Sequence, residues 1–216
     1  MPGTPFFGYF SELARSGQVS AVIHVHAWVA VAWFLLLSTQ PFLIRANRVD
    51  LHRWLGRASV VVVALFLVTA VQVMKHFFTK AVEQYSRDTA LSLLSQSFTG
   101  LTLFLAFYLI AVWKRRSLHA HVAFMVAGAL AAATQGLARL GLYVVGGLPG
   151  ILLVVVLVYA TLLAFMLYAK LRLQQPILKS PYLVTIAMFL LAHAMDFIGS
   201  RTAAWRWIAG QIVSVW

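Results

Sequence analysis

The sequence predicts an all-α integral membrane protein: a bundle of about six transmembrane helices followed by a C-terminal interfacial helix. Composition is the first reason, since 62% of the 216 residues are hydrophobic and only 10% are charged. Soluble domains carry about 25% charged residues, and one soluble core of this size could not bury so many apolar side chains. The second reason is spacing, because charged residues separate apolar runs of roughly 20 residues, the length that crosses a bilayer.

Six runs qualify as membrane spans. They cover approximately residues 20–39, 56–75, 95–113, 119–140, 149–170 and 181–199. Pro41 should end the first run, because proline disfavours a helical conformation at the residue before it. The second run follows Arg57, "SRDTALSLL" supplies capping residues before the third, and the glycine-rich "GGLPG" separates the fourth from the fifth. Pro181 stands at the start of the sixth, where a first-turn proline is tolerated.

The C-terminal tail, "AAWRWIAGQIVSVW", is too short and too mixed for a seventh span. Its tryptophans indicate a helix that lies at the membrane interface. No internal repeat or linker divides the chain, so residues 1–216 are expected to form a single transmembrane domain. The first twenty residues lack a basic segment followed by an apolar one, so no cleavable signal peptide is expected.

The distribution of charge predicts the orientation. The formal net charge is +12, but the basic residues lie between apolar runs, which indicates contact with anionic lipid head groups rather than nucleic acid. The first, third and fifth connections are the more basic and contain Arg45, Arg48, Arg53, Arg57, Lys114, Arg115, Arg116, Lys170, Arg172 and Lys179. The positive-inside rule places these connections in the cytoplasm and both termini outside. Arg53 and Arg57 are one helical turn apart and are expected to contact head groups.

The residue types present exclude several chemistries. The chain has no cysteine, which excludes disulfides, thiolate metal sites, iron–sulfur clusters and a cysteine nucleophile. No "GxSxG" pattern indicates a serine hydrolase. A transporter remains a third hypothesis: the stripe of His121, Gln135 and Arg139 favours it, whereas the lack of a hydropathy repeat and of an interrupted helix pair argues against it. The polar chemistry of the spans therefore depends on the seven histidines.

Ionisable residues at membrane depth are costly and mark function by default. His24 and His26, in the first run, are about 200° apart around a helix, so only one of them can face a site. The face of His26 continues through Trp33 to Gln40 in seven-residue steps. This polar and aromatic stripe favours His26 as the inward residue.

The fourth run offers a similar choice between His119 and His121. From His121 one face of the helix runs through Gly128 and Gln135 to Arg139, which favours His121. The alternative interpretation of this stripe is close helix packing through small residues, with the two ends in contact with water.

His193 lies well inside the sixth run, with Asp196 one turn further on. A carboxylate beside an imidazole can fix its tautomer and raise its strength as a ligand. The alternative is a buried, hydrogen-bonded histidine–aspartate pair that holds no ligand.

Depth in the membrane sorts four histidines into two pairs. His26 and His193 both lie roughly 8–10 Å inside the outer boundary, at 1.5 Å per residue, while His52 and His121 lie at the cytoplasmic boundary. Two axial imidazoles from facing helices are what a six-coordinate b-type haem needs, whereas zinc prefers three or four protein ligands. The pattern predicts that both pairs bind haem b or another metal cofactor. The residues expected beside the ligands are Trp33, Gln135, Arg139 and Asp196.

Three segments resemble a known family. They are "HVHAWVAVAWFLLLSTQPFLIR", "LHRWLGR", and the helix that begins at "HVAFM" and contains Arg139. Together they are similar to the uncharacterised predicted membrane proteins of bacteria grouped as domain-of-unknown-function family 2306. That family has an "HRxLGR" motif and a later "HRRWM…R" helix; this chain has Val122, Ala123 and Phe124 where the second motif has two arginines and a tryptophan. The resemblance covers roughly residues 20–140 and implies a bacterial inner membrane protein. A looser similarity, in helix count and paired histidines alone, is to cytochrome b-561 proteins.

Besides a transporter, two functions are compatible with these observations, and the first is the favoured one. The first is a haem protein that transfers electrons across the membrane and could act as a membrane oxidoreductase, with a quinone or another redox protein as partner. The second is a non-enzymatic subunit of a larger membrane complex or oligomer, or a lipid- or quinone-binding protein. In that case the histidines are interfacial, and Arg139 and Asp196 line the pocket.

Overall fold

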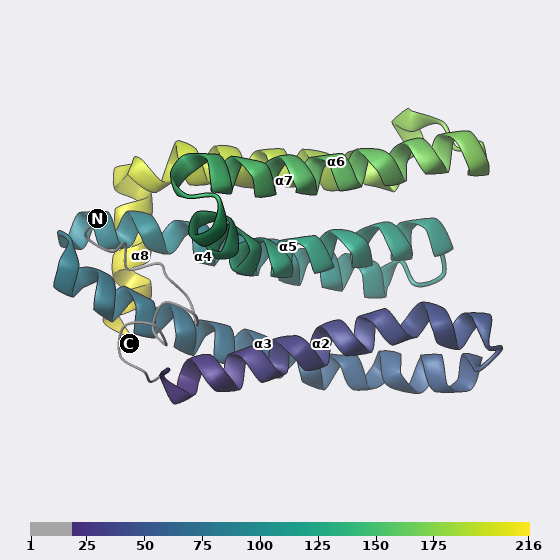
Figure 1. Cartoon of the computed structure of the whole chain (residues 1–216), viewed down its shortest axis with the longest axis horizontal. Coiled ribbons are helices and arrows are strands. Elements are labelled where there is room, and N and C mark those ends of the chain that lie inside the picture. Colours follow the sequence, from purple (N-terminus) through teal and green to yellow (C-terminus); the bar gives the residue numbers. More distant parts are fainter. Residues whose placement is uncertain (1–18) are drawn as a thin grey trace. The chain divides into compact units, whose positions relative to one another are not determined.

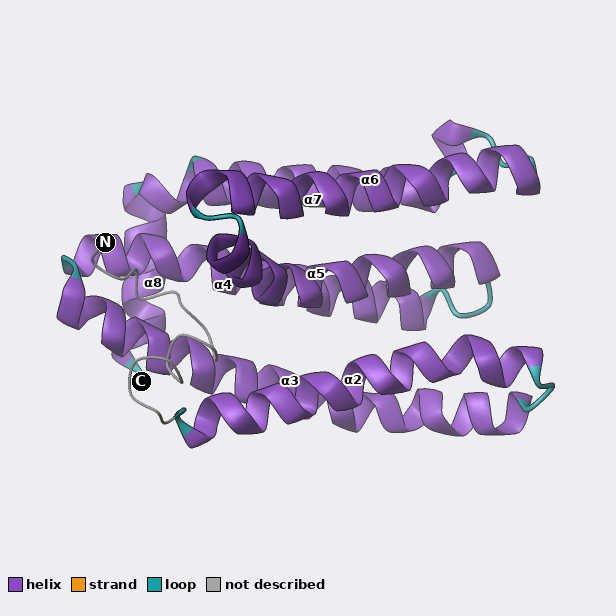
Figure 2. Ribbon diagram, viewed as in Figure 1, coloured by secondary structure: helices purple, strands orange, loops and turns teal. Residues whose placement is uncertain are grey.

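The structure, a computed structural model, describes residues 19–216 and is helical throughout that range apart from short connections (Figures 1 and 2). Its α-helices are α2 (Ala21–Arg45), α3 (Val49–Gln84), α4 (Arg87–Trp113), α5 (Leu118–Val144), α6 (Gly147–Leu173), α7 (Pro181–Phe197) and α8 (Ala203–Ser214). Two short 3₁₀ helices, η1 (Ile177–Lys179) and η2 (Gly199–Arg201), flank α7. The expectation that the first twenty residues contain no signal peptide falls almost entirely outside the described range.

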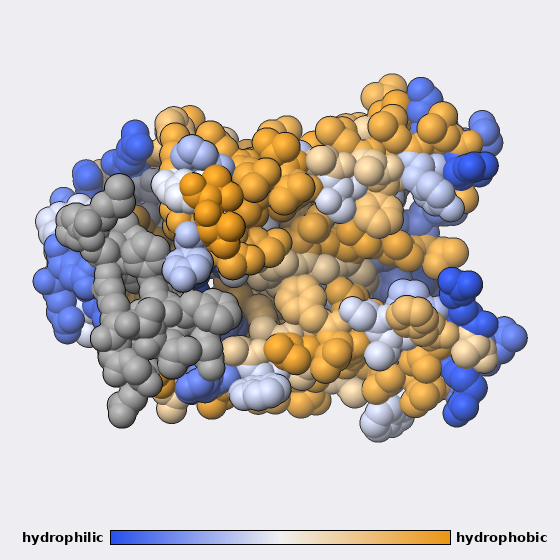
Figure 3. All heavy atoms as spheres, in the orientation of Figure 1, coloured by the Kyte–Doolittle hydropathy of each residue, from blue (hydrophilic) through white to orange (hydrophobic). Residues whose placement is uncertain are grey.

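The predicted fold class is confirmed. Within residues 19–216, six helices are long and apolar enough to cross a membrane, and they correspond one by one to the six predicted spans. Apolar side chains cover the middle length of the helices, and hydrophilic side chains gather at their ends (Figure 3). This is the architecture of a multi-pass membrane protein, and α8 follows as a shorter C-terminal helix.

The helices form two compact units, Met1–Gln84 and Tyr85–Trp216. The described part of the first unit is the antiparallel hairpin of α2 and α3, which are joined by a three-residue turn at 46–48 (Figure 1). The second unit contains α4 to α8, in which α4 packs on α5 and α5 packs on α6, while α7 contacts all three. Helix α8 packs on α4.

The prediction that Pro41 ends the first span is wrong, because α2 continues through Pro41 to Arg45. Proline removes one backbone donor and strains the preceding turn. Only one turn follows Pro41, however, and it remains hydrogen-bonded, with Ala46 N donating to Phe42 O at 2.9 Å. In lipid an unwound backbone would lose more hydrogen bonds than the single one that proline removes.

Helix α3 is longer than predicted at both ends. The sequence predicts a span at 56–75, whereas the helix runs over 36 residues from Val49 to Gln84. The segment "DLHRWLGR" is therefore helical and lies inside α3 instead of preceding it. It contains no proline that would break a helix, and Asp50 in the first turn complements the partial positive charge of the helix N-terminus.

The caps of the second unit follow the predicted residues. Ser86 caps α4 by accepting a hydrogen bond from Thr89 N at 3.3 Å. The glycine-rich break lies between α5 and α6, where Gly146 has a φ of 87°, a left-handed conformation that glycine adopts without strain. Pro181 occupies the first turn of α7, as predicted.

The backbones of α5 and α6 are in close contact at a pair of glycines. A Cβ atom at Gly141 would overlap the carbonyl group of Gly150, and a Cβ at Gly150 would overlap that of Gly141. Close approach through small residues is how membrane helices gain packing energy when lipid supplies no hydrophobic drive. The two glycines therefore fix the spacing at which this hairpin closes.

Replacing Gly141 with alanine is expected to destabilise the protein by about 1–3 kcal/mol, because the added methyl group forces the backbones apart. Thermal unfolding in detergent measures the loss. Gly136→Ala is the matched control, since a Cβ there meets no atom within 4 Å. The control should be neutral or stabilising by up to about 1 kcal/mol, and equal behaviour of the two variants would contradict the packing argument.

Candidate functional site

His26 links α2 to α3 through side-chain contacts. Its Nδ1 atom lies 2.9 Å from the Thr69 hydroxyl, and its ring lies 4.9 Å from that of Phe66. On the same side, Ile23 packs with Val73 and Phe77. The predicted choice of His26 over His24 as the residue facing the neighbouring helix is therefore consistent with these contacts within the first unit.

The hydrogen bonds of Thr69 determine which nitrogen of His26 carries the proton. The Thr69 hydroxyl has one proton, and its oxygen lies 2.8 Å from Leu65 O and 3.1 Å from Phe66 O. Because a helical threonine donates to these preceding carbonyls, its oxygen accepts from His26 Nδ1–H. The Nε2 atom of neutral His26 then carries the lone pair, which is the form that binds a metal.

Seven-residue stripes from both helices meet in this hairpin. On α2 the stripe is His26, Trp33 and Gln40, of which Trp33 is only 1% exposed. On α3 the facing stripe is His52, Ser59, Phe66 and Val73. Phe66 contacts His26, and Val73 packs with Ile23, so this stripe of α3 faces α2. His52 lies on the same stripe, closer to the turn at 46–48.

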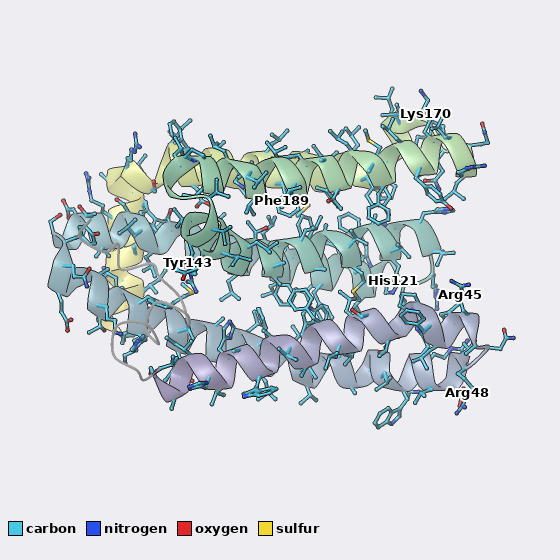
Figure 4. The ribbon with its side chains drawn as sticks, in the orientation of Figure 1. Arg45, Arg48, His121, Tyr143, Lys170 and Phe189 are labelled. Carbon is cyan, nitrogen blue, oxygen red and sulfur yellow. The ribbon has the colours of Figure 1, made fainter. Side chains whose placement is uncertain are left out.

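His121 lies in the first turn of α5 and is held by α4 (Figure 4). Its Nδ1 atom donates to the carbonyl oxygen of Ala111 at 2.8 Å. A carbonyl can only accept, so Nδ1 carries the proton and Nε2 carries the lone pair. Orientation of an imidazole by an Nδ1–H bond to a backbone carbonyl is the usual arrangement of histidine ligands to metals.

The polar stripe of α5 is the contact surface between α5 and α4. Besides the His121 bond, the Gly128 backbone lies against Phe107, and Gln135 Nε2 donates to Gln96 O at 3.0 Å. A Cβ at Gly100 would lie 2.7 Å from Gln135 Nε2, so this glycine makes room for the amide. The alternative interpretation of close helix packing accounts for His121, Gly128 and Gln135, and Arg139 follows one turn beyond.

His193 is hydrogen-bonded to a tyrosine that the sequence did not single out as a site residue. Its Nδ1 atom lies 2.8 Å from the hydroxyl of Tyr159 on α6, with ring centroids 5.7 Å apart. The ring of Phe189, on the same helix α7, stacks on His193 with a centroid distance of 6.2 Å. Sequence alone gives no reason to select Tyr159 among seven tyrosines, because only helix packing brings α6 beside α7.

Asp196 is bound by hydroxyls of α4. Ser95 Oγ donates to Asp196 Oδ1 at 3.2 Å, and Thr99 also forms a side-chain hydrogen bond with this carboxyl group. The hydrogen bonds of His193 and Asp196 therefore lead to two different helices, although the two side chains also interact electrostatically. Tyr159, His193, Asp196, Ser95 and Thr99 together form a polar cluster of α4, α6 and α7, here called the tyrosine–histidine cluster.

The four candidate haem ligands are divided between the two units. His26 and His52 lie in the first unit, and His121 and His193 lie in the second. Each predicted pair takes one histidine from each unit, so both pairings stay predictions. The head-group residues Arg53 and Arg57 are exposed at the start of α3.

Among residues 19–216, no three or more histidine, aspartate or glutamate side chains gather in a way that could hold a metal ion. Axial ligation of a haem needs only two imidazoles, since the macrocycle supplies the other four donors.

Removing the Tyr159 hydroxyl is expected to lower the free energy of unfolding by about 1 kcal/mol, the typical value of one hydrogen bond. Tyr159→Phe should also shift the ¹⁵N NMR signals of one histidine ring, assigned through His193→Gln. Tyr168→Phe is the control, because Tyr168 is exposed on the same helix. Unchanged histidine signals in Tyr159→Phe would rule out the hydrogen bond.

The chain was compared with models of protein families, with curated proteins and with solved structures. None of them matches it.

Proposed function

We propose that this chain is a membrane electron-transfer protein that holds haem b through axial histidine ligands. The observation that carries the proposal is the hydrogen bond from His121 Nδ1–H to Ala111 O, because it presents Nε2 as a ligand. The bond from His26 Nδ1–H to Thr69 supports it in the same way. When bound, haem b would supply a one-electron centre within the membrane.

Of the four predicted ligands, the two cytoplasmic ones, His52 and His121, each suit an axial role within their own unit. His121 has its tautomer fixed, and His52 lies on the stripe of α3 that faces α2, at the basic end of the hairpin. The positive charge of this end, from Arg45, Arg48, Arg53 and Arg57, suits the two carboxylates of the macrocycle.

Of the two predicted outer ligands, His193 is the less suitable for binding haem iron. Tyr159 has an O–H donor, and its hydrogen-bond partner within residues 19–216 is His193 Nδ1. If Tyr159 donates, Nδ1 is the acceptor and Nε2 of neutral His193 carries the proton, which is not the ligand form. His26 therefore remains the better candidate of this pair.

Replacing His121 is expected to abolish or strongly reduce haem binding, because glutamine has no imidazole to bind iron. The measurement is the Soret absorbance and the pyridine haemochrome of purified protein after haem-supplemented expression. His119→Gln is the matched control, since His119 is exposed two residues away in the same turn. A wild-type protein without haem would refute the proposal, and a His121→Gln variant with full haem content would refute this ligand.

A second function is favoured by the tyrosine–histidine cluster. The sequence alternative is a non-enzymatic subunit or a lipid- or quinone-binding protein, and this cluster concentrates donors and acceptors at membrane depth. A quinone carbonyl could accept a hydrogen bond from Tyr159, whose hydroxyl lies beside His193. Quinone binding that depends on His193 and Asp196 in a protein without haem would favour this function over the first.

The proposed location is the bacterial inner membrane, with both termini outside, as the basic connections and the family resemblance suggest. The chain has no cysteine, so single cysteines can report orientation. Ser117→Cys, in the connection from α4 to α5, should be labelled only from the cytoplasm. Val145→Cys, at the other end of α5, should be labelled only from outside, and the reverse pattern would invert the topology.

A further inference from the structure

The buried stripe of α2 ends on an amide that has no partner in the described part of the chain. Gln40 follows His26 and Trp33 at seven-residue spacing, so its side chain lies on the face that packs against α3. Its Oε1 and Nε2 atoms are both buried, and neither has a hydrogen-bond partner within residues 19–216. Unpaired buried amides are rare and costly, above all in lipid, where water does not compensate. Gln40 is therefore better explained by contact with a bound group than by packing.

The hairpin places Gln40 beside His52. The contacts of His26 with Thr69 and of Ile23 with Val73 define the antiparallel register of the two helices. Measured from the turn at 46–48 at about 1.5 Å per residue, Gln40 lies about 7.5 Å along α2 and His52 about 4.5 Å along α3. The unpaired amide and the predicted haem ligand are therefore within about one turn in height, on facing stripes.

Gly56, slightly further along α3 than Gln40 is along α2, is an open position on the helix surface. It lies one turn beyond His52 on α3, about 10 Å from the turn. A Cβ atom at Gly56 would meet nothing within 4 Å, so close packing gives no reason for glycine at this position. A helix interior also favours other residues over glycine. Gly56 is exposed, so its open side is the outer surface of α3, against which a bound group could lie.

Charge favours an anionic partner for the amide. Arg45 and Arg48 lie at the turn that joins α2 and α3 (Figure 4), and Arg53 and Arg57 are exposed on the first turns of α3. Carboxylates form the polar edge of haem b, and an amide N–H is a suitable donor to them.

We propose that Gln40 would help to hold the haem of which His52 is a predicted ligand, with Gln40 Nε2–H as a donor to one of its carboxylates and the exposed backbone at Gly56 leaving room beside α3. This inference rests on the proposed function. It assigns to the first unit a second haem contact, made by a residue that is not a predicted iron ligand. It also explains why a buried amide stands where an apolar side chain would make the haem-free protein more stable.

The test is a haem titration of the full-length protein, prepared without haem in detergent. Gln40→Met keeps the length of the side chain and removes its polar atoms; Gly56→Leu fills the open space. Both are expected to raise the dissociation constant for haem about tenfold, which corresponds to about 1.4 kcal/mol. The midpoint potential of the bound haem should also shift in Gln40→Met. Gln72→Met is the matched control, since Gln72 is exposed on α3, and it should bind like wild type.

The thermal midpoint of the haem-free protein gives a second readout. Gln40→Met should leave it unchanged or raise it, because the substitution removes an unpaired amide from the interior. A lower midpoint would mean that the amide is already paired without haem, which overturns the inference, as would an unchanged dissociation constant. A wild-type protein that takes up no haem refutes the proposed function itself, whereas wild-type binding that Gln40→Met retains refutes only the role of Gln40.

Discussion

Every polar group on a membrane-spanning helix has to find its hydrogen-bond partner inside the protein, because the hydrocarbon of the bilayer offers none. The backbone meets this condition by being helical, which is why α2 continues through Pro41. The side chains meet it by pairing across helices. His26 bonds to Thr69, His121 to Ala111, Gln135 to Gln96, and Tyr159 to His193.

These pairings give the same residues both a structural and a chemical role. The carbonyl of Ala111 holds α5 on α4 and also fixes the tautomer of His121. Thr69 acts in the same way on His26 across the α2–α3 hairpin. Gln40 differs from them, since its amide is buried without a partner in the described range. A side chain that satisfies packing but not hydrogen bonding is where a bound group has most to contribute.

The sequence predicted some features of the site and could not predict others. Seven-residue spacing selected His26, Trp33 and Gln40 as one face of a helix, and the contact with Thr69 agrees with that choice. The same reasoning left the stripe from His121 to Gln135 open between a polar path and a packing surface, and its contacts with α4 favour packing. Asp196 was selected as the neighbour of His193 in sequence, but its hydrogen bonds lead to Ser95 and Thr99. Tyr159 could not be predicted as a partner of His193, because the sequence of one helix does not tell which other helix will lie beside it.

The sequence by itself determined that the chain has six helices long and apolar enough to span a membrane, because apolar runs of this length between charged segments are stable in a bilayer only as helices. It also determined which residues share a face of each helix, because that depends only on helical periodicity. The tertiary structure decided which side chains meet. Those partners depend on how neighbouring helices are aligned, and that is set by contacts far apart in the sequence, such as the glycine pair of α5 and α6 and the Tyr159–His193 hydrogen bond.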